Sequence, residues 1–222
     1  MSIDRGQQLM QFGRYKEALE EFQKSLSEDQ VNPLAFTMMA LCKVNLDNYD
    51  TALKLSEQAI ALAPDFSFPY YVNAQSHYFK GKYKLSHQSI NQAIELDPYD
   101  ADHYSFKAQI YAIQNKFDNA IEMCHEGLAI DPENVDCLNI LSMINVRRGN
   151  KDLDDTTIQD ALELDPDNEF THANKGWAKI QDKDYTQALI HFKESMRLDP
   201  DNEYTRLGII EAIKARNPMY FS

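Results

Sequence analysis

The fold of this chain is decided by the stretch Tyr49-Asp50-Thr51-Ala52-Leu53-Lys54-Leu55-Ser56-Glu57-Gln58-Ala59-Ile60. Its small and apolar side chains recur at steps of three and four residues, which places them on one face of a helix. A proline follows this helix at position 64, and further prolines keep a constant interval of 34 residues: Pro64, Pro98, Pro132, Pro166 and Pro200. A helical pattern that returns at a fixed interval indicates a repeat architecture.

Small side chains keep the same 34-residue interval in three columns. The first column holds Gly6, Ala40, Ala74, Ala108, Ser142 and Gly176. The second holds Ala18, Ala52, Ser86, Ala120, Asp154 and Ala188, and the third holds Ser25, Ala59, Ala93, Gly127, Ala161 and Ser195. Two antiparallel helices approach to about 8–10 Å only where small side chains meet at the crossing. The columns therefore predict two packed helices in every repeat.

Each repeat also carries two helix breakers, one near its middle and one at its end. The middle breakers are residue types that tolerate the left-handed conformation: Gly13, Asp47, Gly81, Asn115 and Gly149. The end breaker is Asp-Pro or Ala-Pro, often followed by Asp-Asn or Glu-Asn. Proline biases the preceding residue out of the helix, and Asn or Asp caps the next one. Each unit is therefore predicted as helix, tight turn, helix, turn.

This 34-residue helix pair, with small residues at its eighth, twentieth and twenty-seventh positions and Pro at its thirty-second, resembles the tetratricopeptide repeat. The resemblance covers nearly the whole chain. It implies an all-α fold, a right-handed superhelical solenoid of antiparallel helix pairs. We expect one solenoid over residues 1–216, built from repeats 1–32, 33–66, 67–100, 101–134, 135–168 and 169–202, a capping helix over 203–216, and a tail over 217–222.

The fifth repeat is the least regular. Lys151 stands in a column that holds Tyr15, Tyr49, Tyr83, Phe117 and Tyr185 in the other repeats. Asp154 stands in a column of small residues, and a buried unpaired carboxylate costs several kcal/mol. We therefore expect the start of this repeat's second helix to be displaced or frayed.

Composition and charge exclude several classes of function. The net charge of −13 repels phosphate backbones and disfavours nucleic-acid binding. No run of about 18 apolar residues occurs, so no membrane span is expected. Three cysteines without a C-x-x-C pair argue against a disulfide framework or a structural zinc site, and fit a reducing, cytoplasmic setting.

Motifs of catalysis are also missing from the sequence. The six histidines show no metal-ligand spacing, and there is no Gly-rich phosphate loop and no nucleophile motif. We therefore predict that the protein is not an enzyme, with no catalytic residue, no metal site and no cofactor.

The family resemblance implies that the first helix of each repeat lines a concave groove. Carried onto this sequence, the family's groove positions hold aromatic and aliphatic side chains with amides spaced among them. The expected partner-binding residues are Met38, Leu41, Phe68, Tyr71, Gln75, Tyr78, Phe79, Gln109, Asn139, Met143, Asn174 and Trp177. We expect Tyr71, Tyr78 and Trp177 to be exposed. Val72, Phe106 and Ile140 fit packing between neighbouring helices equally well.

Such a groove predicts a protein-interaction scaffold or adaptor that binds a peptide or helix of a partner protein. Aromatic rings mark binding hot spots, and amides pair with the backbone of an extended peptide. Ile3 and Gln7 stand where chaperone-binding members of the family place Lys and Asn, so a carboxylate clamp is not expected there.

Two alternatives stay open. The first is a self-assembling structural element, a homo-oligomer of this chain. The second is the soluble arm of a bacterial protein of this family that is tethered to a membrane through residues beyond this chain. The apolar tail Asn217-Pro218-Met219-Tyr220-Phe221-Ser222 suggests this second alternative.

Overall fold

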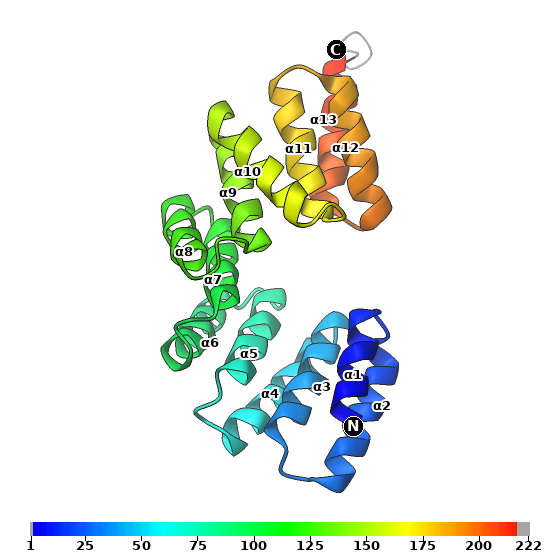
Figure 1. Cartoon of the computed structure of the whole chain (residues 1–222), viewed down its shortest axis with the longest axis vertical. Coiled ribbons are helices and arrows are strands. Elements are labelled where there is room, and N and C mark those ends of the chain that lie inside the picture. The colour runs from blue at the N-terminus through cyan, green and yellow to red at the C-terminus, as the bar shows by residue number, and fades with distance from the viewer. Residues whose placement is uncertain (1, 217–222) are drawn as a thin grey trace. The chain divides into compact units, whose positions relative to one another are not determined.

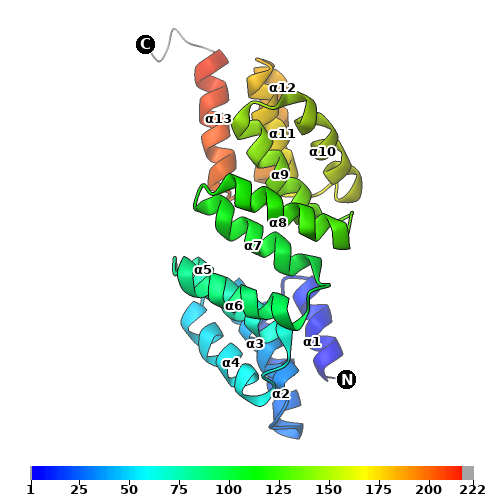
Figure 2. The same cartoon turned by 90° about the vertical axis from the view of Figure 1, so that its left-hand side faces the viewer.

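In the computed structural model, the backbone is described for residues 2–216, and the side chains of Ser2 and of residues 151–155 are not described. Figures 1 and 2 show that the described residues form helices joined by short turns. The helices are α1 (Ser2–Gln11), α2 (Tyr15–Glu28), α3 (Pro33–Asn45), α4 (Tyr49–Leu62), α5 (Ser67–Phe79), α6 (Tyr83–Leu96), α7 (Ala101–Ile113), α8 (Phe117–Ile130), α9 (Val135–Arg148), α10 (Lys151–Leu164), α11 (Glu169–Gln181), α12 (Tyr185–Leu198) and α13 (Glu203–Arg216). From α2 onward, the even-numbered helices start 34 residues apart, and from α3 onward so do the odd-numbered ones.

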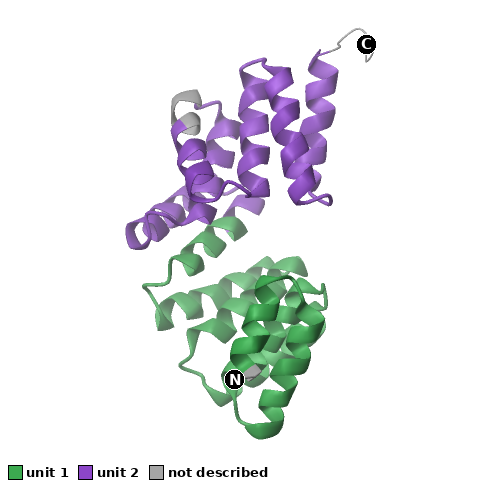
Figure 3. Cartoon of the chain, turned by 45° about the vertical axis from the view of Figure 1, so that its right-hand side comes forward, with its two compact units in different colours: residues 1–110 green, residues 111–222 purple. Residues whose placement is uncertain are grey.

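The chain divides into two compact units, residues 1–110 and 111–222 (Figure 3). In the first unit α1 packs on α2, α3 on α4, and α5 on α6. In the second unit α9 packs on α10 and α11 on α12, while α13 packs on both α11 and α12. Within each unit, α3 also contacts α5 and α9 contacts α11, so the first helices of neighbouring repeats lie together.

The tight turns inside the repeats all use a left-handed residue two positions before the second helix. The five residues expected there have φ between +55° and +72°: Gly13, Asp47, Gly81, Asn115 and Gly149. A sixth, Lys183, has φ +61° and occupies the same place in the last repeat. The sequence did not identify Lys183, because a lysine carries no left-handed preference of its own.

Four of the turns between repeats are closed by asparagine caps, as the sequence predicts. The Asn32 side chain accepts a hydrogen bond from the backbone N–H of Ala35, at 3.0 Å. At the starts of α9, α11 and α13, Asn134 accepts in the same way from Cys137, Asn168 from Thr171 and Asn202 from Thr205. Each cap satisfies a backbone donor that the helix itself leaves unpaired.

Side-chain size is matched between the two helices of a repeat. Phe22 and Phe192 are fully buried and stand in a column whose other members are Ser56, Ile90, Cys124 and Ile158. Where this column holds Phe, the first small-residue column holds Gly. A Cβ built on Gly176 would lie 2.5 Å from Cε1 of Phe192, and one built on Gly6 would also collide with Phe22.

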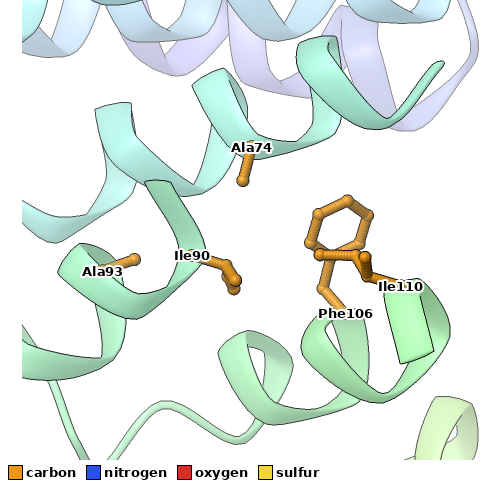
Figure 4. Close-up of a cluster of buried hydrophobic side chains, with 5 residues drawn as sticks. All are labelled: Ala74, Ile90, Ala93, Phe106 and Ile110. Atoms are coloured by element: carbon orange, nitrogen blue, oxygen red, sulfur yellow. The ribbon is translucent and has the colours of Figure 1, made fainter. Parts of the chain in front are cut away.

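The third repeat has side chains of intermediate size at these two positions. Ala74 of α5 and Ile90 of α6 belong to one buried cluster with Ala93, Phe106 and Ile110 (Figure 4). Here a medium side chain faces an alanine. A larger first-helix residue than glycine is thus accommodated where the facing side chain is smaller than phenylalanine, as close packing requires.

The fifth repeat differs from the expectation. Helix α10 begins at Lys151, the same place at which the other second helices begin, so the expected displacement of its backbone is wrong. How the Asp154 side chain is accommodated lies outside the described residues, as does the tail at 217–222. Every described helix falls short of the length and hydropathy that crossing a bilayer requires.

The Lys183 turn gives a first prediction. Lys183→Gly should raise the free energy of unfolding by about 0.5–1 kcal/mol, because Gly relieves a left-handed cost of about 1–2 kcal/mol but gains unfolded-state entropy. Urea unfolding followed by circular dichroism measures the change. The matched control is Lys193→Gly inside α12, which should lower stability by about 1 kcal/mol. Equal effects of both substitutions would contradict the assigned turn.

The glycine–phenylalanine contact gives a second prediction. Gly176→Ala should lower the free energy of unfolding by about 1–3 kcal/mol through overpacking, although helix propensity alone predicts a gain. In a Phe192→Ile background the same change should cost less, because isoleucine faces alanine at the equivalent place in the third repeat. A double-mutant cycle from thermal unfolding measures this coupling. Additive effects of the two substitutions would refute it.

Candidate functional site

A continuous run of aromatic rings crosses the first unit, and we call it the aromatic strip. Its members come from α4, α5, α7 and the loop before α5, and in order of contact they are Phe66, Phe68, Tyr71, Phe106, Tyr78, Phe79 and Tyr49. Successive ring centroids lie between 5.3 and 6.4 Å apart. Most contacts are edge-to-face, and the Tyr49–Phe79 pair is stacked at 5.4 Å. These are the arrangements that aromatic pairs prefer.

The members of the strip differ in their access to solvent. Phe106 is buried, and so is its neighbour Val72, so both pack between helices. Phe68, Tyr71 and Tyr78 are half-buried. Phe79, at the end of α5, is 51% exposed. The side chain most able to meet a partner is therefore Phe79, and Tyr71 and Tyr78 are less open than the sequence suggests.

Two amides lie beside the strip. Gln75 stands one helical turn from both Tyr71 and Phe79 on α5, and its Oε1 is buried with no hydrogen-bond partner among the described residues. Gln109 of α7 is exposed and hydrogen-bonds to the Tyr78 hydroxyl. Burial raises the pKa of that hydroxyl, so Tyr78 stays protonated at neutral pH. The exposed Gln109 amide is therefore the polar group of the strip that solvent or a partner can reach.

The remaining groove residues of the first unit border the same surface. Leu41 of α3 packs, with Phe68 and Tyr71, against a buried cluster of Ala40, Val44, Ala52 and Val72. Met38 packs against the cluster around Phe22. Both side chains are half-buried. The fold thus brings Leu41, Phe68 and Tyr71 together around one cluster, as the family positions imply.

In the second unit the expected asparagines are not available to a partner. Asn139 is 7% exposed, and its side chain donates to Oδ1 of Asn168 at 3.1 Å and accepts from the Thr171 hydroxyl at 2.8 Å. Asn174 is 2% exposed and donates to the backbone carbonyl of Asn139 at 3.0 Å. These amides tie α9 to α11 instead of facing a groove.

Trp177 also has a packing role. Its ring stacks on Tyr204 of α13 with centroids 5.6 Å apart and meets the edge of Phe192 at 5.9 Å. Its indole N–H donates to the Tyr204 carbonyl at 3.3 Å. Trp177 is half-buried and joins α11 to α12 and α13, contrary to the expected exposure. Met143 and Ile140 are half-buried.

The cysteines and the potential metal ligands are the groups that could carry out chemistry. In residues 2–216, apart from the undescribed side chains, no set of three or more His, Cys, Asp or Glu is placed to hold a metal ion. Cys42, Cys124 and Cys137 are buried free thiols. Burial raises the pKa of Cys42 to about 12, and a hydrogen bond with Cys137, together with burial, raises that of Cys124. Thiols in this state are poor nucleophiles.

Comparison with protein families supports the repeat assignment. A family model described as tetratricopeptide repeat matches residues 71–135. A second model with the same description matches residues 34–66 and 171–202. The matched residues together make up more than half of the chain. The comparison with curated proteins gave no match.

Solved structures confirm the all-α repeat solenoid fold. The anaphase-promoting-complex hetero-tetramer Cut9–Hcn1 matches 96% of this chain with a TM-score of 0.83 and 16% identity, and this chain spans 42% of the matched chain. A tetratricopeptide repeat protein from Parabacteroides merdae matches 96%, with a TM-score of 0.75, 13% identity and 83% of its own length covered. YrrB, a TPR protein with an unusual peptide-binding site, matches 88% of this chain, with a TM-score of 0.56, 15% identity and 97% of its own length covered. At these identities the likeness concerns the fold alone.

Proposed function

Because this chain belongs to the tetratricopeptide repeat family, whose repeats serve as protein–protein interaction scaffolds, we propose that it binds a segment of a partner protein on the aromatic strip of its first unit. The observation that carries this proposal is the exposed Phe79 at the end of a continuous run of aromatic rings. Large exposed rings on a rigid helical support are the side chains that most often supply binding energy. The family is generally non-catalytic, which agrees with a scaffold.

The chemistry of the strip defines the partner that we propose. Half-buried rings accept apolar side chains, and the exposed Gln109 amide beside them can accept one backbone or side-chain N–H. A short peptide or amphipathic helix with an apolar face offers both groups. YrrB, a protein of the same fold, has a peptide-binding site, which supports a peptide as the ligand class. The net charge of −13 favours a neutral or basic partner.

A second candidate function is self-assembly through α13. Three large apolar side chains recur at steps of three along this helix and are 53%, 47% and 40% exposed: Leu207, Ile210 and Ile213. Ile210 stands 34 residues after Gly176, in the column that holds only Gly, Ala or Ser in the preceding first helices. A stripe of this kind on one side of a helix is a surface through which two copies could associate.

Other features of the expected setting stay proposals. A reducing, cytoplasmic location rests on the three buried free thiols. A bacterial source and a membrane tether beyond residues 217–222 rest on the sequence resemblance.

A third prediction tests the aromatic strip. Phe79→Ala should weaken binding of the partner captured from source-cell extract by at least about tenfold, because a hot-spot ring contributes about 2 kcal/mol or more. Fluorescence polarisation with a labelled partner segment measures the affinity, and circular dichroism checks the fold. The control is Tyr99→Ala, a ring that is 83% exposed but outside the strip, and it should bind like wild type. Normal binding by a folded Phe79→Ala protein would rule out this surface.

A fourth prediction separates the two candidate functions. If α13 mediates assembly, light scattering should show a mass that rises with concentration, and Ile210→Lys should abolish the rise by placing a charge in the contact. Phe79→Ala should leave the mass unchanged. A wild-type protein that stays monomeric at all concentrations excludes self-assembly and leaves the scaffold proposal intact.

A further inference from the structure

The fourth position of the first helix makes a recurring hydrogen bond in this protein. In three repeats and in the capping helix α13, its side chain reaches the carbonyl of the proline six residues earlier. Three of these side chains can only donate to a carbonyl. The pairs are Tyr70 with Pro64, Tyr104 with Pro98 and Arg206 with Pro200, at 3.1–3.2 Å. The fourth is His172, whose Nε2 lies 3.0 Å from the Pro166 carbonyl. Because a carbonyl only accepts, Nε2 of His172 must carry the proton.

This bond sets the state of the other ring nitrogen. A neutral imidazole with its proton on Nε2 has a bare lone pair on Nδ1. Nδ1 of His172 lies 3.4 Å from Nδ1 of His191 on α12, and the two rings stack with centroids 5.7 Å apart. Two nitrogen atoms from two different helices therefore face one another, and one of them is an acceptor held in place by the backbone.

Charged side chains surround the histidine pair. Burial, the neighbouring His172 and the cations Lys175 and Lys179 lower the pKa of His191 to about 4. Glu194, one turn further along α12, is paired with Arg197.

The distance between the two nitrogens matches a metal bridge. Zinc–nitrogen bonds of about 2.0–2.1 Å in tetrahedral geometry place two ligand nitrogens about 3.3–3.4 Å apart. Metal-binding histidines almost always donate their other N–H to a carbonyl or carboxylate, which fixes the ring. His172 already makes this second bond to Pro166.

We propose that His172 and His191 form a binding site for a borderline divalent metal ion such as Zn²⁺ or Ni²⁺, held between their two Nδ1 atoms. Imidazole nitrogen suits this class of ion. The ring proton of His191 moves to Nε2 when the metal binds, and water completes the coordination, since among the described side chains no third ligand stands at the site. The ion cross-links α11 to α12 within one repeat. The site is independent of the aromatic strip.

The sequence did not reveal this site because the two histidines are 19 residues apart and fit no metal-ligand motif. Their pairing follows only from the packing of α11 against α12. The signal that points to it is the place of His172 in the column of Tyr70, Tyr104 and Arg206, which donate to a proline carbonyl.

The experiment is a titration of the full-length protein with ZnCl₂, followed by long-range ¹H–¹⁵N spectra of the histidine side chains and by thermal unfolding. We expect the Nδ1 signals of His172 and His191 to shift together and the melting temperature to rise. His125, exposed on α8, serves as an internal control and should not shift at the same zinc concentration. Absence of the paired shift, or an equal shift of His125, would overturn the proposal.

Two variants sharpen the test. His172→Tyr removes the ligand but keeps a donor for the proline carbonyl, as tyrosine does in repeats three and four. This variant should fold without zinc and lose at least about tenfold in zinc affinity. His191→Ala should lose the same, and His125→Ala should bind like wild type. A folded His172→Tyr protein whose melting temperature still rises with zinc as in wild type would refute the site.

Discussion

Close approach of the two helices within a repeat is the constraint on which the rest of this structure depends. The backbones come near one another only where a small side chain faces a larger one. The extreme case is Gly176 against Phe192, where even a methyl group would collide with the ring. Ala74 beside Ile90 is the moderate case. Once this contact is made, the turn must be tight, and a left-handed residue closes it even where that residue is Lys183.

The same repeat positions serve structural needs in some units and leave side chains open in others. In the second unit the amides at groove positions form hydrogen bonds inside the fold. Asn139 donates to Asn168, and Asn174 donates to the backbone carbonyl of Asn139. In the first unit the corresponding surface is aromatic, and one oxygen, on Gln75, has no hydrogen-bond partner among the described residues. A polar side chain that is paired inside the fold adds stability, whereas an exposed ring such as Phe79 is suited to a ligand. The two units therefore carry different surfaces on the same scaffold.

Repetition also shows what the first turn of the first helix requires. The proline carbonyl accepts a hydrogen bond from Tyr70, Tyr104 and Arg206, and in the last repeat from Nε2 of His172. Because a carbonyl only accepts, this bond places a proton on Nε2 of His172 and fixes the orientation of its ring toward His191.

The sequence alone determined the helices, their spacing and their caps, because these depend on steric and hydrogen-bonding preferences within a few residues. The places of Pro64, Asn32 and Gly81 in the 34-residue interval were enough for that. It did not determine which groove positions are open. Asn139 and Trp177 looked like surface residues and are held by partners 27 to 35 residues away. It also did not show that His172 meets His191, or that α10 begins in register despite Lys151. Burial and pairing of that kind are set by neighbouring helices, so only the tertiary structure decided them.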